Sequence, residues 1–455
     1  MSKNLAPKNH VFYRNQNWHY PKISHGKGIH LYGVDGTEYI DGCSGSAVAN
    51  LGHGNEEIAQ HAKEQIERIA FTHLSRFTAD PIEEAAERIS NWTPEGLDHV
   101  YFLSGGSEAV ETAIKMSRQY FVERDGINTS KSKVISKWNS FHGNTLGALS
   151  LTGIPGRRKI YSPMLLDFPK VDQFYHYRNQ WGAKTNHETS VFAAKDLEHT
   201  INMIGAENIC AFISEPVVGS AAPGVNPEKI YFDMVREICD KYDILLIIDE
   251  VMSGFGRTGK RLAIDHYDVK PDIIVAAKGM SAGYTPLGAT VASDKVFNTI
   301  MIEGSGKFVH GHTYAGNPLS ASISAKVLEI MERDQIIEKG QPVAEKFTNL
   351  LQGFYEFDFV GDIRGKGFMH GIEFVKNKET KEPFDSSVGF AAKLNSFCME
   401  EGLVVYPGTG SVDGVNGDHI LLTPPINIKA EEVDKMIYRM HQGFKKMDAY
   451  IKGGK

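Results

Sequence analysis

The sequence has few cysteines and no long apolar segment. Its 455 residues include four cysteines, which lie far apart without a CxxC pair: Cys43, Cys210, Cys239 and Cys398. So few thiols in a long chain are typical of a reducing compartment, so we expect a cytoplasmic protein with free thiols and no metal. The longest apolar runs, such as Ile244–Ile248, are far shorter than the roughly 18 residues of a membrane span. The N-terminal MSKNLAPKNH also lacks the apolar core of a signal peptide.

An excess of positive charge is missing too. The chain has 49 Lys and Arg against 56 Asp and Glu, a net charge of −7, and its basic residues are scattered. This pattern excludes an electrostatic nucleic-acid or anionic-membrane binder. A hydrophobic fraction of 41%, with 45 Gly and 18 Pro in no period, excludes disordered and collagen-like proteins. The length predicts two to three domains with sizeable cores.

The middle of the chain alternates helical patterns with short apolar runs, from about Glu83 to Met301. The runs are Val100–Ser104, Val134–Trp138, Ile209–Ser214, Ile244–Asp249 and Asp272–Lys278. Their continuous, partly β-branched character predicts strands buried on both faces of a parallel sheet. Between two of them, KIYFDMVREICDKY places its apolar residues on one helical face. Together these segments indicate an open, doubly wound α/β domain.

The two ends of the chain have a different pattern. Gly26–Ile40 shows the alternation and turn residues of a β-hairpin or meander. After about Ser320 come a long helical pattern, strands near Gly367–Val375 and His419–Leu422, and a helix over Ala430–Tyr450. We therefore expect a smaller α+β domain that includes the N-terminal segment. The predicted limits are 1–65 for the N-terminal segment, 66–320 for the large domain and 321–455 for the small domain.

Several residues that could bind a ligand directly follow the predicted strands. In open α/β sheets, ligands bind outside the carboxyl ends of the strands. Gly105, Gly106 and Ser107 open a helix after the first strand, and they offer close backbone approach, free N–H groups and a hydroxyl to a phosphate. The alternative is an ordinary Ser cap with a Gly turn. Phe141 and His142 follow the second strand, where the ring either stacks on a flat cofactor or packs within its loop.

Charged residues follow the other three strands. Glu215 and Asp249 come directly after buried strands, where carboxylates are costly unless paired or functional. Asp249 would keep a pyridine nitrogen protonated, or else cap a helix or pair with a base such as Arg257. Lys278 ends the last strand, where desolvation would make its amine a nucleophile able to form a Schiff base. The alternative is a lysine that reaches the surface.

A phosphate cup, a stacking ring, a carboxylate and such a lysine are together what pyridoxal 5'-phosphate requires. The sequence resembles class III aminotransferases of the aspartate-aminotransferase fold type, from GKGIHLYGVDGTEYIDGCSG to ILLTPPINI. The stretches that carry the resemblance are ISEPVVGSAAPGV, LLIIDEVMSGFGRTGK, PDIIVAAKGMSAGYTPLGA and HGHTYAGNPLSAS. It implies fold type I of the pyridoxal-phosphate transferases, α/β, with a mostly parallel seven-stranded sheet in the large domain and a smaller α+β domain.

The resemblance also implies roles for individual residues. Lys278 would form the internal aldimine and move the proton, Asp249 would hold the pyridine nitrogen, and Arg257 would be mainly structural. Thr313 would reach the phosphate from the neighbouring subunit of a homodimer or tetramer with shared active sites. The other implied cofactor contacts are Gly105, Gly106, Ser107, Phe141, His142, Glu215 and Val251.

The stretch around Lys278, GMSAGYTPLGA, resembles the branch that acts on ω-amino acids, aminosulfonates and amines with pyruvate as acceptor. We therefore expect a transaminase with a ping-pong aldimine mechanism. The alternatives are a class III isomerase, such as an amino-acid epimerase or aminomutase, and a non-enzymatic interaction module. Ser46 stands where the family's dialkylglycine decarboxylase has Gln, which argues against decarboxylation.

One loop departs from the family pattern. Many pyruvate-dependent members carry an arginine just before the segment GDHI, where it binds the substrate carboxylate. Here no Lys or Arg occurs from Tyr406 to Pro425, and Gly414 and Asn416 stand where relatives often have a basic residue. Either another residue supplies the charge, or water and amide groups hold the acid.

Overall fold

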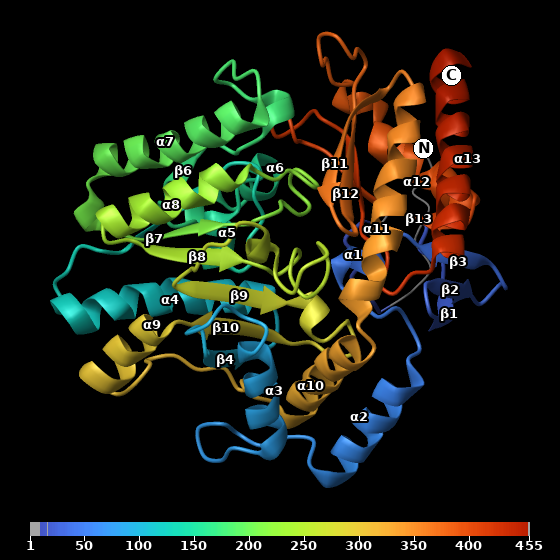
Figure 1. The fold of residues 1–455 in the computed structure, drawn as a ribbon. Helices are drawn as coiled ribbons and strands as arrows, with labels where there is room; N and C mark the ends of the chain where they lie inside the picture. Colours follow the sequence, from blue (N-terminus) through green and yellow to red (C-terminus); the bar gives the residue numbers. More distant parts are fainter. Residues whose placement is uncertain (1–9, 16, 454–455) are drawn as a thin grey trace.

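The computed structural model describes residues 10–15 and 17–453. Its centre is a seven-stranded sheet in the order β4-β10-β9-β8-β7-β5-β6 (Figure 1). The strands are β4 (His99–Leu103), β5 (Lys133–Lys137), β6 (Lys170–Val171), β7 (Ile209–Ser214), β8 (Leu245–Asp249), β9 (Ile273–Ala277) and β10 (Gly288–Ala292). Only β10 runs antiparallel to its neighbours, so the expected mostly parallel seven-stranded sheet is confirmed.

Helices cover both faces of this sheet (Figure 1). Along β8, Leu245 and Ile247 pack in a cluster with Ala109 and other residues of α4, while Leu246 packs on the opposite side with Val235 of α8. Each residue of the strand is thus buried on one face or the other, which explains its continuous apolar sequence. The helices on these faces are α4 (Gly106–Asp125), α5 (Leu146–Leu151), α7 (Asn186–Ile204) and α8 (Lys229–Lys241).

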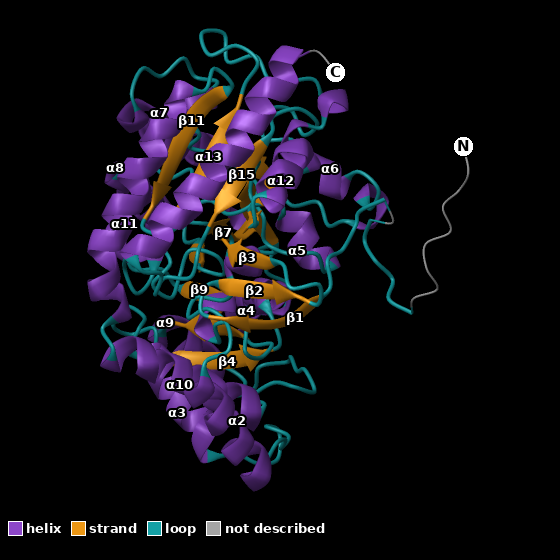
Figure 2. Cartoon of the chain, turned by 90° about the vertical axis from the view of Figure 1, so that its right-hand side faces the viewer, coloured by secondary structure: helices purple, strands orange, loops and turns teal. Residues whose placement is uncertain are grey.

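Two four-stranded sheets lie outside the central one. One is antiparallel, in the order β11-β12-β15-β14, and the other has the order β1-β2-β3-β13. Because β13 pairs in parallel with β3, a strand from the C-terminal region completes the N-terminal meander. The helices α12 and α13 pack against each other beside these sheets (Figure 2). The domain limits stay a prediction.

These outer elements have the following bounds: β1 (Ile23–Lys27), β2 (His30–Gly33), β3 (Glu38–Asp41), β11 (Val360–Lys366), β12 (Met369–Phe374), β13 (Leu403–Val404), β14 (Tyr406–Gly408), β15 (His419–Leu422), α12 (Phe390–Glu400) and α13 (Ala430–Gly453). The remaining α-helical segments are α1 (Ser44–Ala47), α2 (Glu56–Arg68), α3 (Asp80–Ser90), α6 (Pro155–Arg158), α9 (Asp294–Asn298), α10 (Pro318–Arg333) and α11 (Ile336–Gln352). Within the described part of the chain, no helix has both the length and the apolar sequence that crossing a bilayer requires.

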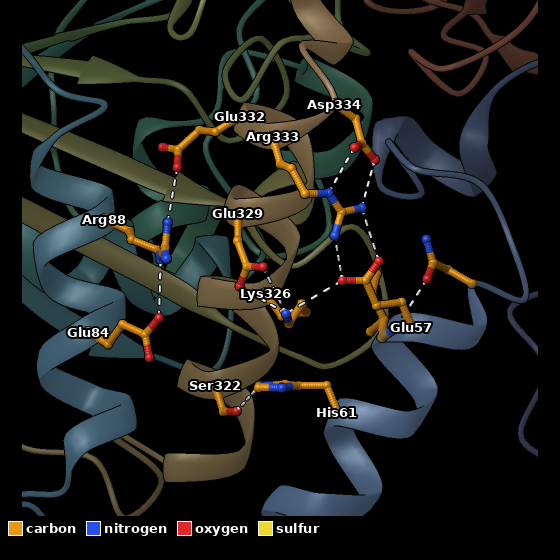
Figure 3. A network of polar contacts seen from close by, with 12 residues as sticks. Glu57, His61, Glu84, Arg88, Ser322, Lys326, Glu329, Glu332, Arg333 and Asp334 are labelled. Atoms are coloured by element: carbon orange, nitrogen blue, oxygen red, sulfur yellow. Dashed lines mark hydrogen bonds and ion pairs between the residues drawn. The ribbon is translucent and has the colours of Figure 1, made fainter.

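Helix α10 joins α2 and α3 through a network of ion pairs (Figure 3). Arg333 pairs with Glu57 at 2.8 Å, and Arg88 pairs with Glu332 at 3.0 Å. These side chains are partly exposed, so each pair contributes about 1 kcal/mol or less. The stronger attachment is apolar, because buried residues of α3 such as Ile89 share one core cluster with those of α10.

Candidate functional site

One cavity lies where the carboxyl ends of β4, β5, β7, β8 and β9 meet. Its lining residues are Gly106, Ser107, Phe141, His142, Gly143, Asn144, Glu215, Val217, Asp249, Val251, Met252, Ser253 and Lys278. The structure therefore brings all the predicted site residues together except Gly105 and Thr313. Parallel strands end at the same edge of a sheet, so residues far apart in sequence converge there.

The N-terminus of α4 forms one wall of the cavity. Gly105 is the N-cap, and the N–H groups of the first turn have no acceptor within the helix. A Cβ atom on Gly106 would lie 2.9 Å from Cγ1 of Val251, so only glycine fits between this helix and the loop after β8. The hydroxyl of Ser107 accepts a hydrogen bond from the N–H of Asn144 at 3.1 Å. Free N–H groups and the positive end of the helix dipole make this wall suitable for a phosphate.

Asp249 and His142 form a buried pair. Oδ2 of Asp249 lies 2.7 Å from Nδ1 of His142, and Oδ1 accepts from the N–H of Val251 at 3.0 Å. Nε2 of His142 has no hydrogen-bond partner among the described residues. The alternative pairing of Asp249 with Arg257 is not seen, because that guanidinium donates to Asn50 Oδ1 and to the carbonyl of Pro424. Asp249 also caps no helix, since a series of turns follows β8.

Glu215 ties together the loops after β5 and β7. Its Oε1 accepts from the N–H of Gly219 at 2.9 Å, and its Oε2 accepts from the N–H of Phe141 at 3.2 Å. Burial raises the pKa of Glu215 above its ordinary value. The carboxyl group therefore holds the loop with the Phe141 ring in place beside the cavity.

Lys278 is partly exposed, and it lines the cavity. It follows β9 with a φ of 50°, and its Nζ donates to the carbonyl of Ser46 at 3.0 Å. Burial lowers the pKa of Lys278 to about 8, although the negative charges of Asp249 and Glu215 oppose this effect. The amine is thus neutral, as a nucleophile must be, in about one tenth of the molecules at pH 7 and in about half at pH 8.

These features fit pyridoxal phosphate. The N-terminal turn of α4 would hold the phosphate. The buried carboxylate of Asp249, which lines the same cavity and pairs with His142, is suited to a protonated ring nitrogen. Lys278 lines the same cavity as Asp249 and the N-terminal turn of α4.

Thr313 lies outside this cavity. It is exposed in the segment between η6 (Thr299–Glu303) and α10. Its predicted contact belongs to a neighbouring subunit, so that contact stays a prediction.

A charged residue that the sequence patterns did not single out lies beside Phe141. The guanidinium carbon of Arg157 is 4.6 Å from the centroid of the Phe141 ring. The adjacent Arg158 is used differently, because it donates to three backbone carbonyls, those of Leu149, Ser150 and Thr152. The sequence shows only two consecutive arginines, and no spacing pattern indicates which one points toward a site.

The segment with Arg157 packs on the loop that lacks basic residues. A Cβ atom on Gly414 would lie 2.7 Å from the ring carbons of Pro155. A long basic side chain at position 414 would therefore collide with α6, whereas Arg157 of that same short helix supplies a positive charge nearby. A positive charge therefore lies on the segment that packs against this loop.

We expect the amine of Lys278 to react at an unusually low pH. In cofactor-free protein, its acetylation by acetic anhydride should rise with pH through a midpoint near 8, because only the neutral amine is nucleophilic. Exposed lysines should show midpoints near about 10.4. Peptide mass spectrometry after labelling at several pH values measures both, and a midpoint above 10 for Lys278 would contradict the described burial.

Comparisons with known proteins agree over most of the chain. The family model described as aminotransferase class-III matches residues 12–444. The chain is 34% identical to the putrescine–pyruvate aminotransferase of Pseudomonas aeruginosa, over 91% of this chain and 88% of the relative. It is 33% identical to gamma aminobutyrate transaminase 3 of Solanum lycopersicum, over 93% of this chain and 80% of the relative. A PLP-bound amine transaminase from an uncultivated Pseudomonas species has a similar structure, with a TM-score of 0.89, 29% identity and coverage of 98% of this chain and 99% of that one.

Proposed function

Because the chain belongs to the class III aminotransferase family, we propose that it transfers an amino group from an ω-amino acid, an aminosulfonate or an amine to pyruvate in a ping-pong reaction. Enzymes of this family use pyridoxal phosphate, which supplies an electron sink for the bond that breaks at the substrate carbon. The relatives named above are transaminases, which favours amino transfer over the isomerase alternative.

The proposed roles follow from the contacts around the cavity. Lys278 holds the cofactor covalently and, once released, carries a proton at Nζ. Asp249, oriented by His142, keeps the ring nitrogen protonated. The remaining residues bind the cofactor: Gly105, Gly106 and Ser107 hold its phosphate, Phe141 covers its ring, and Glu215 and Val251 shape the walls. Thr313 completes the phosphate site of the partner subunit in a homodimer.

The position of Arg157 supports the proposal that the substrate carries an acid group. Its positive charge contributes to the lowered pKa of Lys278, so the guanidinium lies close enough to act on that amine electrostatically. Among the described residues, no carboxylate pairs with its guanidinium within 4.0 Å. A half-buried guanidinium without a partner, stacked on a ring beside the cavity, is suited to bidentate binding of a carboxylate or sulfonate.

Replacing Arg157 should affect donors that carry an acid group more than donors that do not. For Arg157→Gln we expect kcat/KM to fall about tenfold or more for ω-amino acid and aminosulfonate donors, since a charge-assisted pair contributes about 1.4 kcal/mol or more. Arylalkylamine donors, which carry no acid group, should change less than about twofold. Steady-state kinetics with β-alanine, taurine and an arylalkylamine measure this. Lys159→Gln, at the exposed end of the same helix, is the matched control, and equal losses for all donors in Arg157→Gln would contradict the assignment.

The acceptor is tested by following alanine and glutamate separately. We expect alanine to form from pyruvate with at least one of these donors, as the acceptor named for the P. aeruginosa relative supports. Strict dependence on 2-oxoglutarate would overturn the pyruvate assignment. A product formed from one amino substrate without consumption of any keto acid would favour the isomerase.

Asp249→Asn should keep the cofactor but lose turnover. A neutral amide no longer favours the protonated ring nitrogen, so the ring becomes a poor electron sink and kcat should fall by at least about 100-fold. Cofactor absorbance and kcat are measured on the same preparation. Glu250→Gln is the matched control, because this buried neighbour is not among the residues that line the cavity. It accepts from Ser253 Oγ and the Ile264 N–H, and burial raises its pKa to about 7. Near-normal turnover in Asp249→Asn would remove the role assigned to this residue.

A further inference from the structure

A strained loop lies next to the amine of Lys278. Residues 43–48 follow β3, and the short segment labelled α1 within them is an irregular turn rather than a regular helix. Ser44, Gly45 and Ala47 have φ values of 48°, 68° and 56°, in the left-handed region that side chains disfavour. Such a backbone persists only where surrounding contacts hold it.

The buried carboxylate of Asp41 supplies those contacts. Its two oxygens accept from the N–H of Gly45 at 3.1 and 3.0 Å, and Oδ1 also accepts from the N–H of Cys43 at 3.3 Å. On the other side, Oδ2 lies 2.9 Å from Nε2 of His53. The backbone of His53 is itself paired with Gly28 in both directions, at 2.8 and 2.9 Å. One carboxylate therefore links the loop to a fixed point in the N-terminal region.

The loop in turn touches the lysine and covers it. Its Ser46 carbonyl accepts from Nζ of Lys278 at 3.0 Å. Its Ala47 is buried in a small apolar cluster with Val217 and Met252, which both line the cavity. The loop thus orients the amine and forms part of the surroundings that desolvate it.

We propose that Asp41 is a positioning residue for Lys278, because it holds loop 43–48 in the conformation that places the Ser46 carbonyl on the amine and excludes water. The inference rests on the proposed role of Lys278 in the transaminase reaction. Asp41 itself does not line the cavity.

The consequence of losing Asp41 has a definite direction. The relaxed loop would admit water to Nζ, and hydration favours the ammonium form. The other charged groups around this amine, Asp249, Glu215, Arg257 and Arg157, would remain in place. The pKa of Lys278 should therefore rise from about 8 toward its ordinary value of 10.5.

The test uses two variants that disturb the loop differently. Asp41→Ala removes the acceptor, whereas Gly45→Ala removes no contact, because a Cβ atom there has no neighbour within 4 Å and opposes only the φ of 68°. In both full-length variants, freed of cofactor, the acetylation midpoint of Lys278 should rise from about 8 to about 9, which lowers its neutral fraction at pH 7 about tenfold. In the holoenzymes, amide hydrogen exchange at residues 43–48 should accelerate. Asp35→Ala, in the exposed turn between β2 and β3, is the control and should change neither measurement.

A merely structural role predicts a different outcome. Asp41→Ala would then unfold more easily, but the midpoint of Lys278 would stay near 8 in the folded protein, and this result would overturn the proposal. If Asp41→Ala does not fold, the test rests on Gly45→Ala. An unchanged acetylation midpoint of Lys278 together with unchanged hydrogen exchange at residues 43–48 in that variant would also overturn the proposal. Borohydride fixation of the cofactor to Lys278 in the unaltered holoenzyme tests the proposed function separately. Label on another lysine would overturn the proposed function, while the shift in the acetylation midpoint could still be measured.

Discussion

The burial of ionisable groups at one edge of the central sheet is the constraint on which the rest of the site depends. His142, Asp249, Glu215 and Lys278 follow four strands and line one cavity. Each would be costly to bury alone, but Asp249 pairs with His142, Glu215 accepts two backbone N–H groups, and the charges of both carboxylates oppose the desolvation of Lys278. Because of these pairings, the strands can end in buried polar residues without destabilising the core.

Segments outside the sheet finish the cavity. Loop 43–48 covers the amine of Lys278, and α6 brings Arg157 to the ring of Phe141. The loop before β15 carries no cation, and Gly414 leaves room for Pro155 of α6. The 406–425 loop and α6 are thus constrained together by the steric contact between Gly414 and Pro155.

Strand prediction succeeded where both faces of a strand are buried. The runs over Ile209–Ser214 and Ile244–Asp249 agree with β7 and β8 to within a residue. A continuous apolar run of this length that is rich in β-branched residues favours a buried strand over a helix. By contrast, β6 has only two residues, and β10 reads GATVA, whose small residues resemble a loop. It pairs antiparallel between β4 and β9, which depends on partners distant in sequence.

The sequence by itself determined five of the central strands, the polar residue after each of them, and the family that these residues indicate. It did so because these signals are local: hydrophobic period, strand ends and short motifs. Only the tertiary structure decided that Asp249 pairs with His142 rather than Arg257, that Arg157 and not Arg158 lies over the ring of Phe141, and that Asp41 supports the loop on Lys278. Each of these choices depends on which backbone segments meet in space, and such contacts, whether they span 107 residues as between His142 and Asp249 or 4 as between Asp41 and Gly45, leave no periodic trace in the chain.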